Sequence, residues 1–140
     1  MINIAIVGHG FVGKGVEYGF AENNLQIIDP ALYGNSVDNV NKDTVVSFVC
    51  VPTPFGENGE INASIVVDVV EKLLKNNDGL VVIKSTVIPS IVDQLSAKSK
   101  RVIYNPEFLT ERNAQMDFIN PPMNIFGGDD FEYNSDKYHR

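Results

Sequence analysis

Short apolar runs rich in β-branched residues recur along this chain between stretches of helical periodicity, and this alternation limits the fold more than any other feature. Residues 2–7 (INIAIV), 44–51 (TVVSFVCV) and 80–85 (LVVIKS) are almost continuously apolar. Such runs are typical of strands buried on both faces of a sheet, whereas half-exposed strands alternate apolar and polar residues. Shorter strands are predicted at residues 25–29, 101–104 and 124–126.

Three helices are predicted between these strands. Residues 11–22 carry apolar side chains four positions apart, which places them on one helical face. A second helix begins at a cap formed by Asn62 or Ser64 and runs to about residue 75, and Pro89 opens a third. Residues 30–43 are polar and rich in turn formers, and they show little periodicity.

Strands that alternate with helices in this way predict an α/β fold: a Rossmann-type, doubly wound, mostly parallel sheet with helices on both faces. The length of 140 residues corresponds to one domain. We assign a single reduced domain to residues 1–128. Residues 129–140 have no periodic pattern and are expected to form a frayed tail.

The net charge of the chain indicates which classes of binding partner are unfavourable. The net charge of −7 argues against a nucleic-acid or anionic-membrane surface, because both attract basic patches. The beginning, MINIAIVGHG, lacks the features of a signal peptide, and no apolar run approaches the roughly 18 residues of a membrane span. A cytoplasmic protein without nucleic-acid or membrane partners is expected, and no metal ligands are assigned.

A glycine motif, GHGFVG at residues 8–13, stands between the first predicted strand and the first predicted helix. In a dinucleotide-binding loop, Gly8 would permit the tight turn, Gly10 the approach of a diphosphate, and Gly13 close packing of helix on strand. The N–H groups and positive dipole end of the helix would then face the diphosphate. Taken alone, the motif also fits an ordinary strand-to-helix turn.

Asp29 closes the second predicted strand about 20 residues further on. A carboxylate at this point can accept hydrogen bonds from the adenosine ribose, and its charge would repel a 2′-phosphate, so NAD is favoured over NADP. The alternative is that Asp29 is a surface turn residue before Pro30. His9 is interpreted as a loop residue at the mouth of the site and is given no role.

Four separated stretches carry a resemblance to a known family: VGHGFVG at 7–13, VPTP at 51–54, KSTVIPS at 84–90 and NPEFLTER at 105–112. In this order and at these spacings they resemble the N-terminal NAD-binding domain of the UDP-glucose/GDP-mannose dehydrogenase family. Enzymes of that family oxidise the C6 alcohol of a nucleotide sugar to a carboxylate, using two NAD and a cysteine-bound intermediate. The resemblance implies NAD as cofactor and a nucleotide sugar as substrate.

The resemblance also implies roles for residues at matching positions. Glu111, with Thr86, would position and deprotonate water at the reaction centre, and Glu107 occupies the other acidic position of the motif. The alternative is that Glu107 binds nearby backbone N–H groups and Glu111 is a solvated charge at a helix end. The residues expected to contact the cofactor are Gly8, Gly10, Phe11, Val12, Gly13, Asp29, Val51, Pro52, Thr53, Ser85 and Thr86.

Later motifs of the family have no counterpart in this sequence, including the glycine-rich segment with the nucleophilic cysteine. Cys50, the single cysteine, stands in an apolar strand and is interpreted as an unactivated core residue. We therefore expect a truncated NAD-binding domain, inactive unless a separate chain supplies the substrate domain. A stand-alone NAD-binding module and a degenerate Rossmann scaffold remain alternatives, and self-association to a homo-oligomer stays open.

Overall fold

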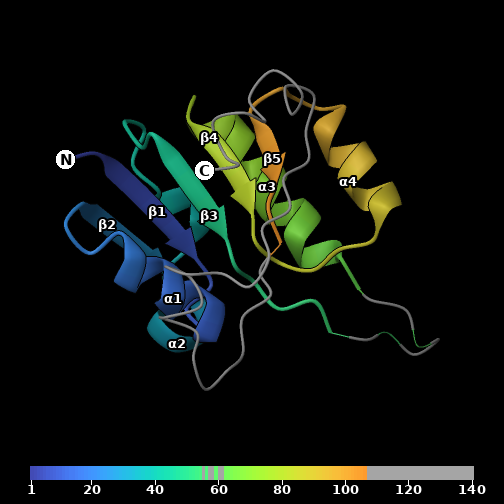
Figure 1. The fold of residues 1–140 in the computed structure, drawn as a ribbon, viewed down its shortest axis with the longest axis horizontal. Coiled ribbons are helices and arrows are strands. Elements are labelled where there is room, and N and C mark those ends of the chain that lie inside the picture. Colours follow the sequence, from blue (N-terminus) through green and yellow to red (C-terminus); the bar gives the residue numbers. More distant parts are fainter. Residues whose placement is uncertain (55, 57–58, 60–61, 107–140) are drawn as a thin grey trace, which may run out of the picture.

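A computed structural model of the chain describes residues 1–54, 56, 59 and 62–106 (Figure 1). Its centre is a five-stranded sheet in which every neighbouring pair of strands is parallel. The strand order is β2-β1-β3-β4-β5, so the chain reverses direction across the sheet between β1 and β3. The strands are β1 (Asn3–Val7), β2 (Asn24–Ile28), β3 (Val46–Val49), β4 (Leu80–Ile83) and β5 (Val102–Tyr104).

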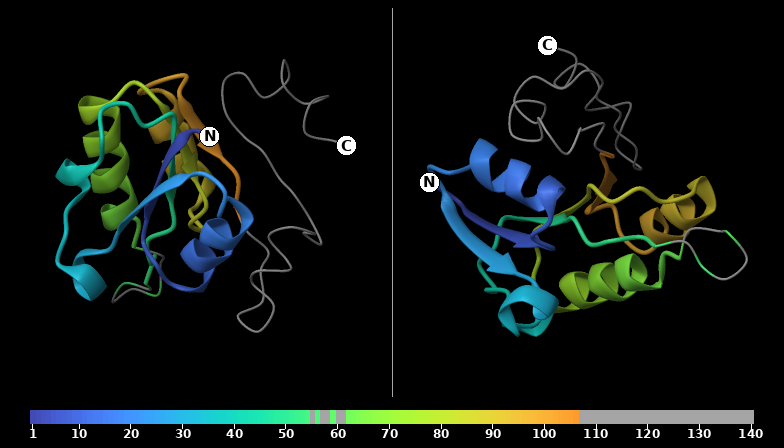
Figure 2. Two further views of the ribbon diagram at one scale, coloured as in Figure 1. Left: turned by 90° about the vertical axis from the view of Figure 1, so that its left-hand side faces the viewer. Right: turned by 90° about the horizontal axis from the view of Figure 1, so that it is seen from below.

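Helices cover both faces of this sheet, as Figure 2 shows for α1 on one side and α3 on the other. One apolar cluster joins α1 to the sheet through Val16 and Phe48, and a larger one contains Val70 of α3 and Leu95 of α4. The predicted doubly wound α/β fold is confirmed. The helices are α1 (Phe11–Gly19), α2 (Pro30–Tyr33), α3 (Ser64–Asn76) and α4 (Pro89–Ser96), with a 3-10 turn, η1, at Val37–Asn39.

Residues 30–43, which the sequence shows to be rich in turn formers, contain the four-residue helix α2 and the three-residue 3-10 turn η1. The Asp29 side chain accepts hydrogen bonds from the N–H groups of Ala31 and Leu32, which fixes the first turn of α2. Ser36 and Asn39 form a reciprocal capping box around η1. Short side chains that bond to the local backbone make such turns stable without any apolar periodicity.

The first helix ends earlier than predicted, at Gly19 rather than at residue 22. Phe20 leaves the helical conformation, and the Asn23 N–H group bonds to its carbonyl oxygen at 2.9 Å, which turns the chain into β2. The Phe20 ring packs 5.2 Å from that of Phe48, so its apolar side chain still faces the sheet. The predicted strand at 124–126 and the tail at 129–140 lie outside the described residues, and the domain boundary stays a prediction.

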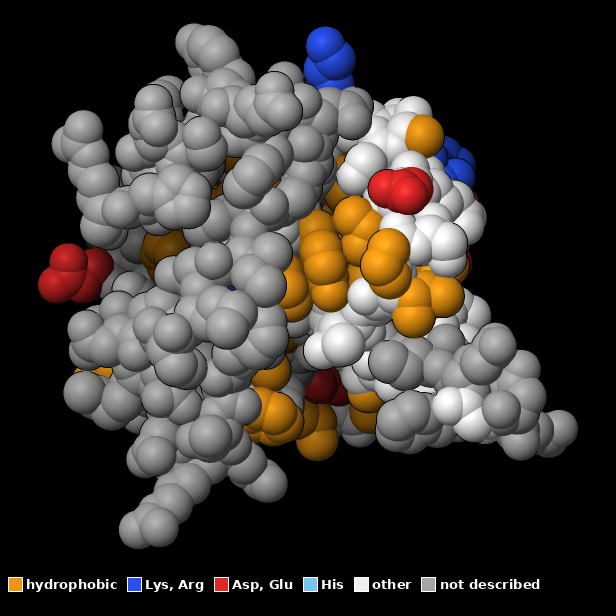
Figure 3. All heavy atoms as spheres, turned by 45° about the vertical axis from the view of Figure 1, so that its right-hand side comes forward, with side chains coloured by type: hydrophobic (Ala, Val, Ile, Leu, Met, Phe, Trp, Pro, Cys, Tyr) orange, Lys and Arg blue, Asp and Glu red, His pale blue; other side chains and the backbone are white. Residues whose placement is uncertain are grey.

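Some apolar surface remains exposed among the described residues. Hydrophobic side chains gather on the face shown in Figure 3. A groove of about 450 Å³ also lies between the start of α3 and α4, lined in part by Val67, Ile88 and Ile91. In the part of the chain that the structure describes, no helix is both long enough and apolar enough to traverse a bilayer.

Candidate cofactor site

The parallel register brings the ends of the strands into one row at the carboxyl edge of the sheet. Backbone bonds continue one residue past the strands: Cys50 N–H to the Val7 carbonyl at 2.7 Å, and Lys84 N–H to the Val49 carbonyl at 2.9 Å. The Asn105 N–H group bonds in the same way to Ile83, at 2.9 Å. Residues far apart in the sequence therefore become neighbours along this edge.

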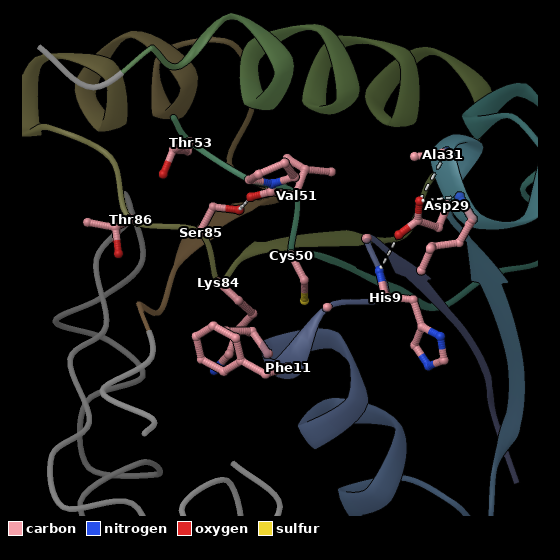
Figure 4. Close-up of a pocket in the computed structure, with 15 residues that line it drawn as sticks. His9, Phe11, Asp29, Ala31, Cys50, Val51, Thr53, Lys84, Ser85 and Thr86 are labelled. Atoms are coloured by element: carbon pink, nitrogen blue, oxygen red, sulfur yellow. Dashed lines mark hydrogen bonds between the residues drawn. The ribbon is translucent and has the colours of Figure 1, made fainter. Parts of the chain in front are cut away.

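A cavity of about 600 Å³ opens above this row (Figure 4). Its volume falls within the range typical of ligand sites, roughly 300–1,000 Å³. It is lined by Gly8, His9, Gly10, Phe11, Val12, Asp29, Ala31, Leu32, Cys50, Val51, Pro52, Thr53, Lys84, Ser85 and Thr86. Except for Gly13, every residue that the sequence predicts at the cofactor therefore contributes to one cavity.

The three glycines of the loop meet three different steric demands. Gly8 has φ of +97°, and a Cβ there would lie 2.6 Å from the Cys50 carbonyl oxygen. A Cβ on Gly13 would overlap the carbonyl oxygen of Gly8, so Gly13 lies behind the cavity and lets α1 pack on the loop. A Cβ on Gly10 would meet nothing within 4 Å. The fold thus requires Gly8 and Gly13, whereas Gly10 leaves open space for a ligand.

The beginning of α1 is suited to an anion. Gly10 is the N-cap and provides no side-chain cap, and the Lys14 N–H group bonds to its carbonyl oxygen at 2.9 Å. The helix offers no backbone acceptor to the N–H groups of the residues before Lys14. Those of Phe11, Val12 and Gly13 therefore point out of its N-terminal end. Backbone N–H groups and the helix dipole at such a position favour a diphosphate.

Asp29 lies at the β2 side of the cavity, immediately after that strand. One carboxylate oxygen accepts from the His9 N–H group at 2.8 Å, and the other from Ala31 and Leu32 at 3.1 Å each. A carboxylate offers about four acceptor positions, so three bonds leave room for a ribose hydroxyl. The two interpretations of Asp29 from the sequence are compatible, because the same side chain caps α2 and faces the cavity.

His9 connects the loop to both neighbouring helices. Its Nδ1 atom lies 2.7 Å from the Tyr33 hydroxyl and its Nε2 atom 3.0 Å from a Glu17 carboxylate oxygen. Both ring nitrogens are thus occupied by contacts to α2 and α1. This arrangement gives His9 a structural function beside the phosphate loop.

The residues after β3 and β4 form the opposite side of the cavity. The buried Ser85 hydroxyl donates to the Val51 carbonyl at 2.7 Å, which ties the two loops together. Thr53 and Thr86 lie on the same side, as Figure 4 shows. Glu107 and Glu111 lie outside the described residues, so their proposed roles remain predictions.

Lys84 is a cavity residue that the sequence interpretation missed. Its side chain is only 4% exposed and its ammonium donates to Asn105 Oδ1. Burial, which disfavours the charged form, lowers the pKa of Lys84 from 10.5 to about 8, and the nearby Cys50 opposes this shift. The available signal was a lysine directly after the apolar strand run LVVI.

Cys50 does not have the properties of a nucleophile. It packs against the apolar cluster that includes Ile4 and Val16, and burial raises its thiol pKa from 9.0 to about 12, opposed by Lys84. A thiol with so high a pKa stays protonated at neutral pH. The expectation of an unactivated thiol is confirmed.

Among the described residues, no group of three or more His, Cys, Asp and Glu could hold a metal ion.

A parallel sheet, a glycine loop at the first helix and an acidic residue after β2 define a dinucleotide-binding domain of the doubly wound class. Residues 33–138 match the model of the NAD binding domain of the UDP-glucose/GDP-mannose dehydrogenase family. The chain belongs to this family, as its NAD-binding domain, and its cofactor is NAD.

Individual relatives agree with this assignment. UDP-glucose 6-dehydrogenase of Rickettsia typhi is 43% identical over 104 residues, which cover 69% of this chain and 23% of the relative. GDP-mannose 6-dehydrogenase of Pseudomonas aeruginosa is 32% identical over 102 residues, 61% of this chain and 23% of that enzyme. The chain thus spans about a quarter of the length of the curated relatives it matches.

Solved structures show the same fold. A UDP-glucose dehydrogenase from Pyrobaculum islandicum superimposes with a TM-score of 0.76 at 22% identity, over 98% of this chain and 43% of that chain. A GDP-mannose dehydrogenase from Pseudomonas aeruginosa gives a TM-score of 0.74 at 23% identity, over 94% of this chain and 42% of that one.

Proposed function

We propose that this chain binds NAD across the cavity at the carboxyl edge of the sheet. Asp29 would bind the adenosine ribose, the N-terminus of α1 the diphosphate, and the loops after β3 and β4 the nicotinamide half. The observation that carries this proposal is that motifs separated by up to 78 residues, Gly8 to Thr86, line one cavity. The cavity also lies where the strand order reverses, the usual position of a dinucleotide in such sheets.

We further propose that the domain serves a nucleotide-sugar 6-dehydrogenase of the UDP-glucose 6-dehydrogenase type, located in the cytoplasm. Such an enzyme oxidises a C6 alcohol to a carboxylate with two NAD, and Glu111 with Thr86 would activate water, with Glu107 beside them. Hydride transfer requires alcohol, base and nicotinamide in one water-excluded cleft. Because the thiol of Cys50 is unactivated, a second chain or domain would supply the substrate site and the nucleophile.

A second candidate function is NAD binding without turnover, either as a stand-alone module or, at the limit, as a scaffold that has lost its ligand. The open space at Gly10 and the uncapped α1 terminus favour retained binding over the scaffold. The stand-alone module and the enzyme component are distinguished by turnover. Only the enzyme component would produce NADH when a nucleotide sugar and a substrate domain are added.

Substitution of Asp29 tests the cofactor assignment. Wild-type protein is expected to bind NAD more tightly than NADP in a calorimetric titration. Asp29→Ala is expected to weaken NAD binding by about tenfold or more, because it removes a charged acceptor worth about 1.5–3 kcal/mol. Ser36→Ala is the matched control, since Ser36 also caps a helical turn but does not line the cavity. Equal affinity for NAD and NADP would contradict the role given to Asp29.

Turnover separates the two candidate functions. The 140-residue chain alone is expected to produce no NADH from UDP-glucose and NAD, as followed by absorbance of the reduced nicotinamide. Addition of the substrate domain of a related UDP-glucose 6-dehydrogenase is expected to restore NADH production if the chain is an enzyme component. Steady NADH production by the chain alone would show that it carries a complete active site.

A further inference from the structure

His9 anchors the phosphate loop to the two helices that flank it. Its side chain is only 11% exposed, and its ring lies 2.7 Å from the Tyr33 hydroxyl of α2 and 3.0 Å from a Glu17 carboxylate oxygen of α1. The Tyr33 ring also lies against it, with 5.7 Å between the ring centroids. Its chain neighbours, Gly8 and Gly10, have no side chains, so the imidazole alone ties this part of the loop to both helices through a side chain.

Both contacts of the ring form whether or not it is protonated. The Glu17 carboxylate only accepts a hydrogen bond, so Nε2 carries a proton, and in the neutral ring Nδ1 then accepts from the Tyr33 hydroxyl. In the protonated ring Nδ1 donates to the same hydroxyl oxygen. The anchor is therefore geometric and does not require a charge on His9.

The backbone of the same residue holds the carboxylate expected at the adenosine ribose. The His9 N–H group donates to Asp29 Oδ2 at 2.8 Å, a bond that Figure 4 shows, while the imidazole turns away from the loops after β3 and β4. The other carboxylate oxygen accepts from N–H groups in the first turn of α2. A closed path of contacts thus runs from Asp29 through α2 and Tyr33 to the His9 ring, and from the His9 N–H group back to Asp29.

The orientation of the Asp29 carboxylate depends on this path. Its two oxygens are held by two different segments, the loop and α2, so a shift of one segment against the other would turn the carboxylate. The start of the loop is fixed by its backbone, because the Gly8 N–H group bonds to the Ile28 carbonyl oxygen at 2.7 Å. The next residue is held to α2 by the bond between its side chain and Tyr33. Groups that contact a ligand are precise only when such supporting contacts lock them.

We propose that His9 is a positioning residue for cofactor specificity: its anchored side chain, acting through its N–H group, holds the Asp29 carboxylate where it accepts from the adenosine ribose and repels a 2′-phosphate. This inference rests on the proposed binding of NAD and on the role proposed for Asp29. Tyr33 and Glu17 would act through His9, since neither is among the described residues that line the cavity. The ratio of Kd for NADP to Kd for NAD reports this function, because contacts common to both cofactors cancel in it.

Calorimetric titrations with NAD and NADP measure this ratio. His9→Ala keeps the N–H group but removes both ring contacts, and it is expected to lower the ratio about fivefold, the effect of one typical net hydrogen bond. Tyr33→Phe removes only a hydroxyl, and a fall of about threefold is expected. Tyr18→Phe is the matched control: it removes the same group from a half-exposed tyrosine of α1 that is not among the described lining residues, so the wild-type ratio is expected.

The same substitutions in an Asp29→Ala background separate positioning from a direct effect on the cofactor. If His9 acts through Asp29, neither His9→Ala nor Tyr33→Phe changes the ratio further once the carboxylate is gone. A fall in the ratio that persists in this background would show a direct effect on the 2′-phosphate and would overturn the inference. Thermal unfolding checks that each variant is folded. Tyr33→Phe, a small change at an exposed side chain, decides the question if His9→Ala does not fold.

These titrations also distinguish failure of the inference from failure of the proposed function. If the wild-type protein binds neither NAD nor NADP, the proposed function fails and the inference fails with it. If Asp29→Ala lowers the ratio but His9→Ala and Tyr33→Phe keep the wild-type value, the NAD site stands and only the role of His9 is wrong. A purely structural histidine would give that result, with a lower midpoint of thermal unfolding in His9→Ala and an unchanged ratio.

Discussion

Replacement of Gly10 by valine is expected to abolish NAD binding while leaving the protein folded. The added side chain would extend into the space that lies open at Gly10 and would block the approach of a diphosphate to α1. Loss of two charge-assisted hydrogen bonds, each worth about 1.5–3 kcal/mol, would weaken binding by at least about 100-fold. Calorimetric titration of the variant with NAD measures this loss.

Folding of the Gly10 variant is expected to be nearly normal. Gly10 is extended, with φ of −82° and ψ of −159°, a conformation that valine adopts readily. The cost is that of an unfavourable N-cap, about 1 kcal/mol. Gly13→Ala provides the contrast: its Cβ would overlap the Gly8 carbonyl oxygen, so destabilisation of about 3 kcal/mol is expected. NAD binding that survived in Gly10→Val would refute the assignment of the phosphate loop.

The second large effect is a pH dependence of stability that arises from Lys84. Its pKa is 10.5 ordinarily and about 8 in the folded protein, so between these values the unfolded chain holds the proton that the folded protein has lost. Stability rises with pH wherever the unfolded state binds more protons. The contribution of Lys84 is therefore a rise of about 3 kcal/mol from pH 8 to pH 10.5.

Cys50 contributes with the opposite sign. Its thiol pKa is about 12 in the folded protein against 9.0 ordinarily, so the unfolded chain loses this proton first and stability falls above pH 9. The two contributions overlap between pH 9 and 10.5 in the wild-type protein. Cys50→Ala removes the fall in stability above pH 9, so that the rise in stability due to Lys84 can be measured by itself.

Urea unfolding of Cys50→Ala and of the double variant Cys50→Ala/Lys84→Met, at several pH values from about 7.5 to about 10.5, gives the measurement. The difference in free energy of unfolding between the two is expected to change by about 3 kcal/mol across this range, because other titrating groups cancel. A difference that does not vary with pH would show that Lys84 titrates normally.

Much of the fold could be predicted from local sequence because the signals are themselves local. A strand buried on both faces needs a continuous apolar run, as residues 44–51 show around β3. The glycine loop is recognisable because its steric demands fall on single positions such as Gly8 and Gly13. The cap that starts α2 was also encoded locally, in Asp29 followed by Pro30, but apolar periodicity does not detect it.

The candidate site was only partly predictable for a different reason. The sequence alone predicted a phosphate loop, an acidic residue after β2 and the motifs that follow β3 and β4. Only the tertiary structure decided that Cys50, Lys84 and Asn105 are neighbours, since this depends on strand order and register. Burial of a lysine is set by the strands beside it, and no periodicity along the chain specifies which strands those are. The positive charge in the cavity is therefore a property of the folded sheet.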